Sequence, residues 1–498
     1  MKSIQKTFVF ILFALLIGSS TIGFSQQSID TKFTDNTVFP KDKFGEVLQN
    51  LISTFNSKDT NKITAFVKTH FEKQMIEMCP MEIHQEFFLS VAKSTGGIVF
   101  HSLRNYNDTV TNEKILIFQD QNYSLWRELY ISITNEKECL ISSLFLADAL
   151  PPLSGLENKI TQTELVMESK NLIEKLYKKD LFSGTVLIAN NDKILFEKAC
   201  GEASKSYHVL NNIDTKFNLG SMNKMFTVTA IMQLVEKGVL KLNDTISKYI
   251  NEDWLPKEIT NKITIHHLLS HSSGLGSYFN ETYFNSSREL YRIIEDFKPL
   301  VQGDTLLFEP GTRFEYSNTG MLLLGVIIQN STKQDYFEYI RKNIYEPSGM
   351  TNSDSYEMDQ PVENLAIGYI PTEKNKYGWE NNLYKHVIKG GPAGGGYSTV
   401  RDLHKFALAL TNEKLISKTS LDLIWTDHLK SRYGYGFEVM MSENGKVVGH
   451  SGGFPGLNSN LDIFLENGYV VVVMSNYDSA ANPVATKIKE IIGRLKTN

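Results

Sequence analysis

The chain is poor in cysteine. Its 498 residues include Cys79, Cys139 and Cys200, and no Cys-x-x-Cys motif occurs. Three thiols cannot all pair within one chain, which excludes a framework of disulfides that uses every cysteine. Cys79 and Cys139 lie in the same N-terminal region and could form one disulfide after export, while the alternative is three buried free thiols.

An excess of charge of one sign is also lacking. The sequence has 51 Lys and Arg against 56 Asp and Glu, which gives a formal net charge of −5 at pH 7. This balance argues against a nucleic acid or an anionic membrane surface as the partner. Hydrophobic residues make up 41% and charged residues 21%, as in ordinary soluble globular proteins. The length is sufficient for two folded domains after an export signal.

Apolar runs long enough to cross a bilayer are absent from the sequence. Residues 1–6 are basic, residues 7–18 are a short apolar stretch, and residues 21–25 supply small side chains for cleavage. This order predicts a secretory signal peptide over residues 1–25. The apolar stretch is short for a spanning helix, and no cysteine stands near the cleavage region to carry a lipid anchor. We therefore expect a periplasmic or secreted protein with no membrane span after signal cleavage.

Neither a metal-binding nor a phosphate-binding motif is complete. The histidines that come closest to a ligand pattern are His70, His84 and His101 near the N-terminus, and His266, His267 and His271 in the middle of the chain. The first group is scattered, and no nearby carboxylate or cysteine completes the second. The glycine-rich residues 390–396 lack the Gly-Lys-Ser/Thr ending of a phosphate loop and are better explained as a tight turn. The sequence therefore predicts no metal ion, no nucleotide and no organic cofactor.

The most informative stretch runs from Ser221 to Lys224, at the start of a helical pattern that is apolar nearly all round and ends near Gly238. A serine and a lysine three residues apart share one helix face, so the amine can take the hydroxyl proton and make the serine a nucleophile. A helix of this kind is buried, and burial lowers the pKa of a lysine toward the neutral amine that a general base requires. The alternative is a lysine that reaches the surface along its own aliphatic stem.

Two motifs further along the chain favour the catalytic interpretation. In the first, Tyr316 supplies a phenol that can relay protons, and Asn318 supplies an amide that can bind a substrate carbonyl or the lysine. In the second, His450 stands at the end of a strand-like segment and is followed, one residue later, by Gly452 and Gly453. Two glycines at the end of a short strand let a substrate lie close to its edge.

The order Ser-x-x-Lys, Tyr-x-Asn and His-Ser-Gly resembles the serine beta-lactamase and penicillin-binding-protein superfamily. It is most similar to the class C beta-lactamase-like branch, which also contains esterases and D-amino-acid peptidases. Further matching segments lie at residues 268–275, 347–351, 394–403 and 433–437, within a region that spans residues 180–476. The resemblance implies a catalytic domain in which an antiparallel sheet flanked by helices lies beside a helical lobe, with the active site in the cleft.

The resemblance also implies a role for each motif residue. Ser221 would attack a carbonyl carbon, and Lys224 and Tyr316 would accept and return its proton, either of them being the formal base. The backbone N–H groups of Ser221 and Gly453 would form an oxyanion hole, in which the loss of one donor typically costs about 3–4 kcal/mol. The substrate-binding residues implied in this way are Asn318, His450, Gly452 and Gly453.

His450 departs from the class C pattern, which has lysine at this position. A lysine supplies a fixed positive charge for the carboxylate beside a beta-lactam ring. An imidazole with its usual pKa is mostly neutral at pH 7 and gains charge as the pH falls toward about 6. The His-Ser-Gly variant is more similar to the esterases and peptidases of the family, where His450 would contact the leaving group or the carboxyl end of the substrate.

We therefore expect an exported serine hydrolase that acts through a covalent acyl-enzyme on a small ester or a D-amino-acid-type peptide. The alternatives are a beta-lactamase or DD-peptidase, and a penicillin-binding sensor that acylates without turnover. An interaction scaffold with an inactive hydrolase domain would not need all three motifs. The expected partner is a small-molecule or peptide substrate, and the sequence leaves the oligomeric state open.

Residues 151–160, which contain two prolines and a glycine, form the expected linker between two domains. On its N-terminal side, apolar residues follow helical spacing over residues 44–55 and 63–71. Strand-like segments follow at residues 98–103, 114–118, 125–133 and 140–146. Helices followed by a four-stranded meander predict a small α+β domain at residues 28–150, similar in pattern to the NTF2 family.

Residues 161–498 are expected to be the catalytic domain. Hairpins are predicted at residues 185–198 and 461–474, the second with an Asn-Gly turn. Together with a strand at residues 447–450, they could form one antiparallel sheet that joins both ends of the domain, with a mostly helical insertion between them. The predicted fold class is a multidomain α+β protein, in which a small α+β domain precedes a beta-lactamase/transpeptidase-like domain.

Overall fold

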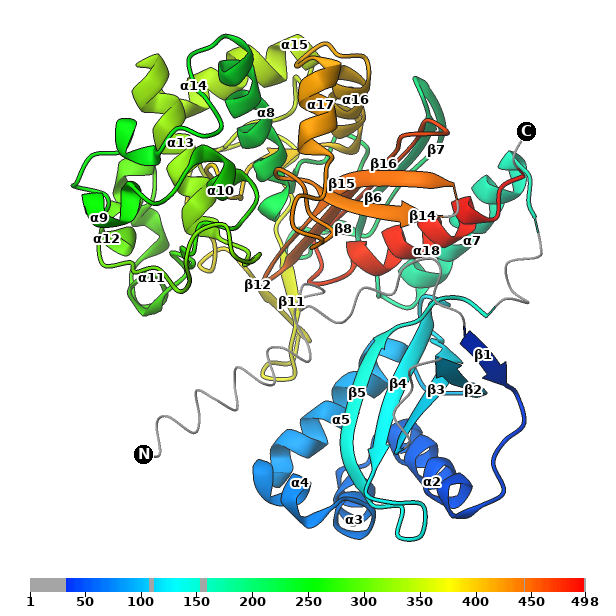
Figure 1. Ribbon diagram of the computed structural model, residues 1–498. Coiled ribbons are helices and arrows are strands. Elements are labelled where there is room, and N and C mark those ends of the chain that lie inside the picture. Colours follow the sequence, from blue (N-terminus) through cyan, green and yellow to red (C-terminus); the bar gives the residue numbers. More distant parts are fainter. Residues whose placement is uncertain (1–32, 107–111, 153–158, 443, 497–498) are drawn as a thin grey trace. The chain divides into compact units, whose positions relative to one another are not determined.

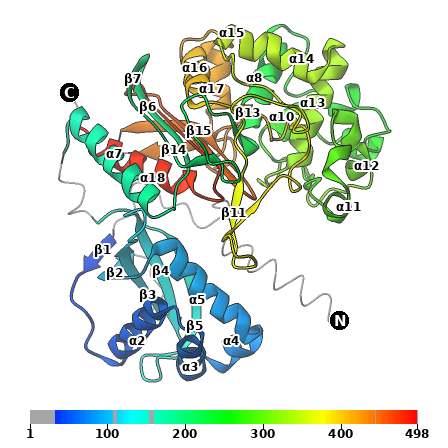
Figure 2. The same cartoon turned by 180° about the vertical axis from the view of Figure 1, so that it is seen from behind.

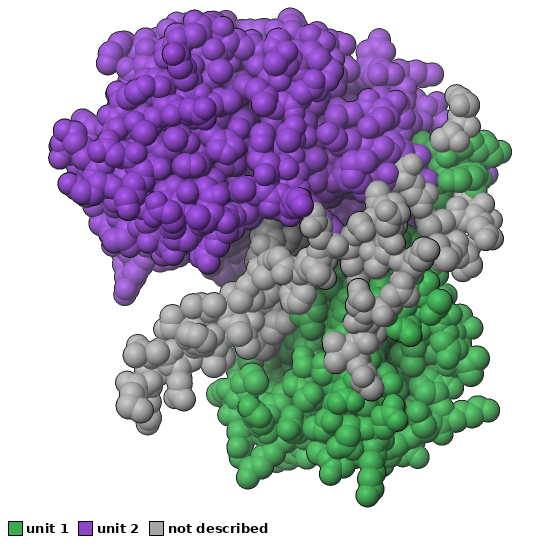
Figure 3. Space-filling view, viewed as in Figure 1, with its two compact units in different colours: residues 1–161, 494–498 green, residues 162–493 purple. Residues whose placement is uncertain are grey.

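The chain divides into two compact units in the computed structural model, which describes residues 33–106, 112–152, 159–442 and 444–496 (Figures 1 and 3). Unit 1 comprises residues 1–161 and 494–498, and unit 2 comprises residues 162–493. The end of the chain belongs to unit 1 because the backbone N–H of Ile160 donates to the carbonyl of Arg494, and that of Lys496 donates to Ile160. The expected signal peptide lies outside the described residues, as do residues 153–158 of the expected linker.

Unit 1 is an antiparallel five-stranded sheet with helices packed on it, and its strands follow one another in sequence order. The strands are β1 (Phe33–Asn36), β2 (Phe100–Tyr106), β3 (Glu113–Gln119), β4 (Trp126–Ile133) and β5 (Ile141–Asp148). The helices are α2 (Lys43–Ser57), α3 (Thr60–His70), α4 (Lys73–Met78) and α5 (Met81–Thr95). The predicted helices and meander are present, whereas β1, α4 and α5 were not predicted. The similarity to the NTF2 family stays a prediction.

Helix α2 shows why this part of the sequence folds as it does. Its N-terminus is capped by Asp42, whose carboxylate accepts the N–H of Gly45 at 3.0 Å. Val47, Leu51 and Phe55 recur at helical spacing and are buried in the core of unit 1. The apolar stripe therefore fixes which face of the helix meets the sheet.

All three cysteines, each within a described segment, are free thiols. The Sγ atom of Cys79 lies 3.3 Å from Nε2 of His84, and the thiol of Cys139 donates to the carbonyl of Glu136 at 3.1 Å. The sequence left open whether Cys79 and Cys139 form a disulfide, and in the structure they do not. Both thiols serve as local packing and hydrogen-bonding groups.

Unit 2 is built on an antiparallel six-stranded sheet in the order β14-β15-β16-β17-β6-β7. Its strands are β6 (Gly184–Asn190), β7 (Lys193–Cys200), β14 (Glu438–Ser442), β15 (Gly445–Phe454), β16 (Leu457–Phe464) and β17 (Tyr469–Ser475). Strand β6 pairs with β17, with Val186 opposite Val473. The two ends of the unit therefore meet in one sheet, as predicted, and β14 extends it beyond the prediction.

Both faces of this sheet are covered by helices (Figures 1 and 2). Helices α7 (Gln162–Lys178) and α18 (Ala481–Gly493) pack on one face, and α16 (Val400–Thr411) packs on the other. This explains the apolar run of β17, in which every residue is buried. Val470 and Val472 enter the core that also contains residues of α16, while the alternating side chains face away from it.

The chain between β10 (Phe217–Asn218) and β14 is the predicted, mostly helical insertion, which forms the helical lobe and also contributes α16, the helix that packs on the sheet. Its α-helices are α8 (Asn223–Glu236), α9 (Lys257–Thr260), α10 (Ile265–Leu269), α11 (Glu281–Asn285), α12 (Lys298–Val301), α13 (Asn318–Thr332), α14 (Tyr336–Ile340), α15 (Glu346–Ser348), α16 and α17 (Lys418–Ile424). Single helical turns lie at η1 (Gly220–Met222), η2 (Ile246–Lys248), η3 (Arg288–Leu290), η4 (Ile294–Phe297) and η5 (Arg341–Tyr345). The remaining short strands are β8 (Glu202–Ser204), β9 (Val209–Leu210), β11 (Tyr369–Pro371), β12 (Trp379–Asn381) and β13 (Tyr397–Ser398). Helices α8 and α13 pack against each other in the core of the lobe.

Candidate active site

The N-termini of two buried helices bring the first two motifs together. Ser221 lies in the single turn η1 directly before α8, and Asn318 is the first residue of α13. Ser317 caps α13 by accepting the N–H of Gly320 at 2.9 Å. Because both helices are apolar nearly all round, they are buried side by side, and the polar residues at their ends meet at the edge of the core.

The side chain of Lys224 is fully buried, so the lysine does not reach the surface. Its Nζ atom lies 2.9 Å from Oδ1 of Asn318, 2.5 Å from the carbonyl oxygen of Ala393 and 3.1 Å from Oγ of Ser221. Burial lowers the pKa of Lys224 well below its usual value. A neutral amine has two N–H groups and one lone pair. The amide and carbonyl oxygens can only accept, so they take the N–H groups and leave the lone pair for the Ser221 hydroxyl.

Tyr316 contacts both members of this pair. Its phenol is hydrogen-bonded to Ser221, and the Nζ atom of Lys224 lies 4.7 Å from the centre of its ring. Burial raises the pKa of the phenol, the bond to Ser221 opposes the rise, and the charge of Glu438 adds to it. The phenol is therefore protonated at neutral pH. The site combines an amine whose lowered pKa favours the neutral form, which can accept a proton, with a phenol that can donate one.

Glycines let strand β15 approach the serine. A Cβ atom at Gly452 would lie 1.9 Å from the carbonyl oxygen of Leu219, and one at Gly220 would lie 2.9 Å from the backbone nitrogen of Gly453. Gly220 also has a φ of +51°, which favours glycine. A Cβ atom at Gly453 would lie 3.7 Å from Nδ2 of Asn458, which is an ordinary contact. Gly452 therefore packs against the turn that carries the serine, while Gly453 presents its backbone beside it.

The glycine-rich residues 390–396 form a tight turn next to the same serine. The N–H groups of Gly391 and Gly394 donate to each other's carbonyl oxygens, at 2.8 and 3.1 Å. The side chain of Asn223 holds both ends of the turn, through the carbonyl of Gly391 and the N–H of Gly396. The turn thereby fixes the carbonyl of Ala393 that the lysine contacts.

His450 lies in a cluster of aromatic rings that also contains Tyr316. Its Nδ1 donates to the carbonyl of Ser451, which can only accept, so Nε2 is the acceptor for the hydroxyl of Tyr433 at 2.8 Å. Burial lowers the pKa of His450 to about 4, Glu438 opposes this and Lys224 adds to it. The ring is neutral at pH 7, and neither nitrogen is left for a substrate.

His271 is a buried member of the same cluster. Its Nδ1 accepts the N–H of Ser317 at 3.0 Å, so Nε2 carries the proton. The ring lies 4.4 Å from that of Tyr316 and 4.9 Å from that of Tyr433. Burial lowers its pKa well below the usual value, and Nε2 has no hydrogen-bond partner within the described part of the chain. The sequence placed this histidine in a matching segment, residues 268–275, without a role.

A pocket with about 440 Å³ of empty space opens beside Ser221. The residues that line it are Asn218, Gly220, Ser221, Tyr278, Phe279, Tyr283, Asn318, His386, Val387, Ala393, Gly394, Gly395, Gly453 and Phe454. The sequence predicted Ser221, Asn318 and Gly453 but missed the aromatic residues, which belong to no motif. Of the described residues, those predicted for the site but absent from this lining are Lys224, Tyr316, His450 and Gly452.

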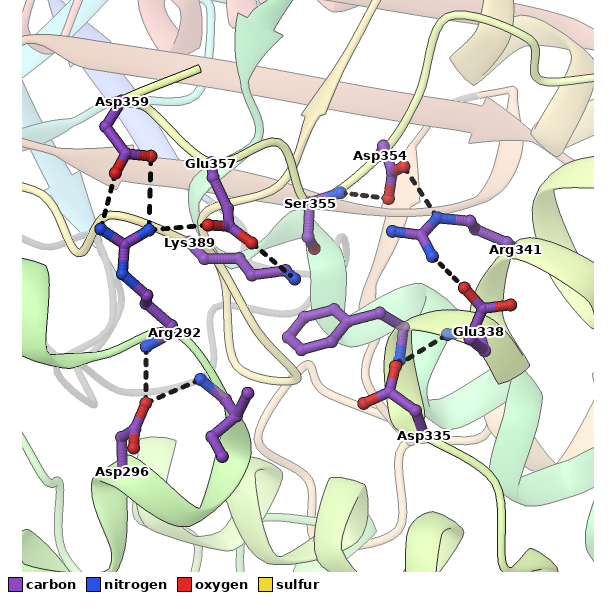
Figure 4. Close-up of polar contacts among 12 residues, drawn as sticks. Arg292, Asp296, Asp335, Glu338, Arg341, Asp354, Ser355, Glu357, Asp359 and Lys389 are labelled. Atoms are coloured by element: carbon purple, nitrogen blue, oxygen red, sulfur yellow. Dashed lines mark hydrogen bonds and ion pairs between the residues drawn. The ribbon is translucent and has the colours of Figure 1, made fainter.

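Ion pairs fasten the segment that precedes the glycine-rich turn (Figure 4). Arg292 pairs with Glu357 at 2.7 Å and with Asp359 at 2.6 Å, and Lys389 reaches Glu357 at 3.2 Å. Next to Lys389, the N–H of Ile388 donates to the carbonyl of Arg288. Because Arg292 and Asp359 are partly exposed, these pairs contribute little to stability and mainly fix the position of the segment.

The histidines considered as metal ligands have other partners. The Nδ1 atom of His266 lies 2.5 Å from the hydroxyl of Tyr435, and Nδ1 of His267 accepts the N–H of Thr264 at 3.2 Å. Within the described ranges, no three or more His, Cys, Asp or Glu side chains are grouped so that they could hold a metal ion. No helix in these ranges combines the length and the apolar character needed to cross a membrane.

The two-lobed fold, with a serine beside a buried lysine at the junction of sheet and helices, defines a serine hydrolase with the beta-lactamase/transpeptidase fold. The chain belongs to the Beta-lactamase family, whose sequence model matches residues 170–492. Penicillin-binding protein 4* of Bacillus subtilis (strain 168) is 30% identical over 324 residues, which cover 62% of this chain and 71% of that protein.

Two further proteins are similar over a larger share of the chain. The putative penicillin-binding protein PbpX of Bacillus subtilis (strain 168) is 31% identical over 387 residues, which cover 74% of this chain and 91% of that protein. The crystal structure of a penicillin-binding protein from Bacillus halodurans superposes with a TM-score of 0.59 and 30% identity, covering 67% of this chain and 99% of the other. The similarity therefore extends over the catalytic unit.

Proposed function

We propose that the protein is an exported enzyme that hydrolyses a small ester or a D-amino-acid-type peptide through an acyl-enzyme on Ser221. One observation carries the proposal. The fully buried Nζ of Lys224 contacts Asn318, Ala393 and, at 3.1 Å, the Ser221 hydroxyl; once the amine is neutral, the two oxygens that can only accept take its N–H groups and leave its lone pair for that hydroxyl. A serine in this setting is an activated nucleophile.

The proposed reaction has two steps. In the first, Oγ of Ser221 attacks the carbonyl carbon while its proton passes to Nζ of Lys224, and the phenol of Tyr316 donates a proton to the leaving group as the bond to it breaks. Tyr316 regains a proton through the network that includes Lys224. In the second step, water attacks the acyl-enzyme with the same groups, and the serine is released protonated. Lys224 is the formal base in this scheme because burial favours its neutral form and the protonated form of Tyr316.

The negative charge that develops on the carbonyl oxygen needs hydrogen-bond donors. We assign this role to the backbone N–H groups of Ser221 and Gly453, because both residues line the pocket and the nitrogen of Gly453 lies next to Gly220, the residue before Ser221. Asn318 orients the substrate while it holds the amine. Gly452 supports this arrangement from the neighbouring position on β15, and His450 supports it through the cluster of aromatic rings that contains Tyr316.

The neutral state of His450 favours an ester or peptide over a carboxylate-bearing beta-lactam. A beta-lactamase or DD-peptidase is the second candidate, supported by the similarity to penicillin-binding proteins. A penicillin-binding sensor would acylate once and not turn over.

Periplasmic or secreted localisation is proposed from residues 1–25. Mass spectrometry of the N-terminal residue of the exported protein tests it.

Comparison of kcat/KM for a small ester, a D-amino-acid peptide and a beta-lactam tests the proposal, with Ser221→Ala as the matched control. We expect turnover of the ester or the peptide and loss of activity in the variant. A fluorophosphonate should add to the peptide that contains Ser221 in the wild type alone. An adduct elsewhere, full activity in Ser221→Ala, or acylation without turnover on every substrate would overturn it.

A further inference from the structure

We propose that the pocket beside Ser221 is a subsite for an uncharged aromatic or bulky apolar acyl group, and that this group defines the substrate class. The inference rests on the acyl-enzyme proposed above. Its first support is a continuous wall of rings centred on Phe279. The centre of that ring lies 4.6 Å from Tyr278, 4.9 Å from Tyr283 and 5.5 Å from Phe454. Such a wall offers edges and faces to another ring.

The second support is the absence of charge. Among the described residues that line the pocket, there is no Asp, Glu, Lys or Arg. His386 lines it with a ring whose Nε2 lies 2.7 Å from Nδ2 of Asn382, and burial lowers its pKa to about 4. A carboxylate placed here would lose its water without gaining a cation, whereas an apolar group would gain contacts.

The third support is that the wall is built to stay in place. Asn280 caps α11 by accepting the N–H of Tyr283 at 3.0 Å and donates to the carbonyl of Leu300 at 2.9 Å. The guanidinium of Arg288 donates to the carbonyls of Tyr283 and Ser286 and lies 4.1 Å from the ring centre of Tyr283. The guanidinium of Arg288 is thus engaged by backbone oxygens, and it holds the ring of Tyr283 in its orientation.

The position of the proton donor indicates which part of the substrate the pocket receives. A leaving group must lie beside the phenol of Tyr316. Tyr316 is not among the described residues that line the pocket. The pocket is therefore available to the acyl side of the scissile bond. Phe284 is 59% exposed, and its ring lies 6.5 Å from that of Phe279, so the apolar surface continues outward for a longer acyl group.

Three p-nitrophenyl esters that share one leaving group test the inference: the acetate, the 3-phenylpropionate and the hydrogen glutarate. Each kcat/KM is divided by the rate of alkaline hydrolysis of the same ester. We expect the phenylpropionate to exceed the acetate by about 10-fold or more, and the glutarate to fall below the acetate. An acetate and a phenylpropionate within about 3-fold of each other, or a glutarate as good as the phenylpropionate, would overturn the inference.

The variant Phe454→Lys should change the two substrates in opposite directions, a result that misfolding could not produce. The new cation should raise turnover of the glutarate while it lowers that of the phenylpropionate, and an unchanged ratio would count against the subsite. Tyr207→Ala is the matched control, because Tyr207 is an aromatic residue that is 81% exposed and lies outside the described pocket lining. If a fluorophosphonate labels Ser221 but no acyl preference exists, only this inference fails. If Ser221 is not labelled and Ser221→Ala stays active, the proposed function fails.

Discussion

The Nζ atom of Lys224 lies 2.5 Å from the carbonyl oxygen of Ala393, so the glycine-rich turn at residues 390–396 holds the lysine of the first motif. The amide oxygen of Asn318 takes the other N–H of the same amine. Since neither oxygen can donate, the neutral form of the amine has only its lone pair left for Ser221. The reactivity proposed for the serine therefore depends on a neutral lysine and on two acceptors that orient it.

Lys224→Arg should lose about 100-fold or more in kcat/KM for a small ester, the usual scale for acid–base catalysis. A guanidinium stays protonated and has no lone pair for the Ser221 hydroxyl. Lys224→Met is the matched control, because it keeps an unbranched side chain without a charge in the buried site and should lose a similar factor. Stopped-flow measurement of acylation checks the result. Acylation near the wild-type rate in Lys224→Arg would mean that Tyr316 or water removes the proton.

His271 should act as a positioning residue for Tyr316. Its backbone has a φ of +53°, a conformation that asparagine tolerates, and an asparagine amide oxygen can accept the N–H of Ser317 as Nδ1 does. We expect His271→Asn to keep kcat within a few-fold, and His271→Ala to lower it by about 10-fold or more with little change in KM. The kcat against pH of both variants checks this. Equal activity in the two variants would contradict the role.

The parts of the site that the sequence predicted are those fixed by short spacing. Ser221 and Lys224 are three residues apart on one helical turn, and Tyr316 and Asn318 share the start of another helix, so their proximity follows from local structure. The sheet was predictable because its hairpins have alternating apolar residues and tight turns. The helical turns and hairpins depend on few long-range contacts, whereas the pairing of β6 with β17 joins the two ends of unit 2.

The rest depended on tertiary contacts. Phe279 lies in the loop before α11 and Phe454 is the last residue of β15, and only the folded chain brings the centres of their rings to 5.5 Å from each other. The charge state of His450 could also not be predicted from the sequence. The usual pKa predicts a ring that titrates near pH 6, whereas burial lowers the pKa to about 4. The sequence identified the histidine, but its burial decides its charge.

The folded state should lose stability in mild acid. His386 and His450 have pKa values of about 4 when folded and 6.5 when exposed, so between these pH values the unfolded chain binds protons that the folded chain does not. Stability therefore falls as the pH falls through this window. We expect a loss on the order of 1 kcal/mol per ring at about pH 5, seen as a lower Tm than at about pH 7.5. His386→Gln should reduce this difference, and an unchanged Tm in the wild type would contradict the prediction.

Unit 2 should fold and work without most of unit 1. A fragment of residues 156–498 keeps Ile160, whose backbone pairs with Arg494 and Lys496, and should hydrolyse a small ester with kcat/KM close to that of the full chain. A matched fragment of residues 162–498 loses these hydrogen bonds and should have a lower Tm. Circular dichroism and ester hydrolysis measure both. A folded but inactive 156–498 fragment would show that unit 1 completes the site.

His450 should make a carboxylate-bearing beta-lactam a poor substrate relative to a simple ester. Its ring is neutral, and both nitrogens are engaged, by Tyr433 and by the carbonyl of Ser451. The missing attraction for a carboxylate is worth about 1–4 kcal/mol, depending on how dry the site is. This corresponds to roughly 5- to 1000-fold in kcat/KM. Lactam turnover that matched the ester at about pH 8, where the imidazole is uncharged, would show that His450 is no barrier.

The same histidine predicts how selectivity responds to pH. A ring with the usual pKa would gain charge toward about pH 6 and begin to favour the lactam, but burial lowers the pKa of His450 to about 4. The ratio of lactam to ester turnover should therefore be the same at about pH 6 and about pH 8. His450→Lys should raise this ratio by supplying a cation, whereas His450→Gln, which is neutral, should not. A wild-type ratio that rises at the lower pH would mean that the imidazole becomes protonated there. The ring would then have to be hydrated in solution and able to contact the substrate.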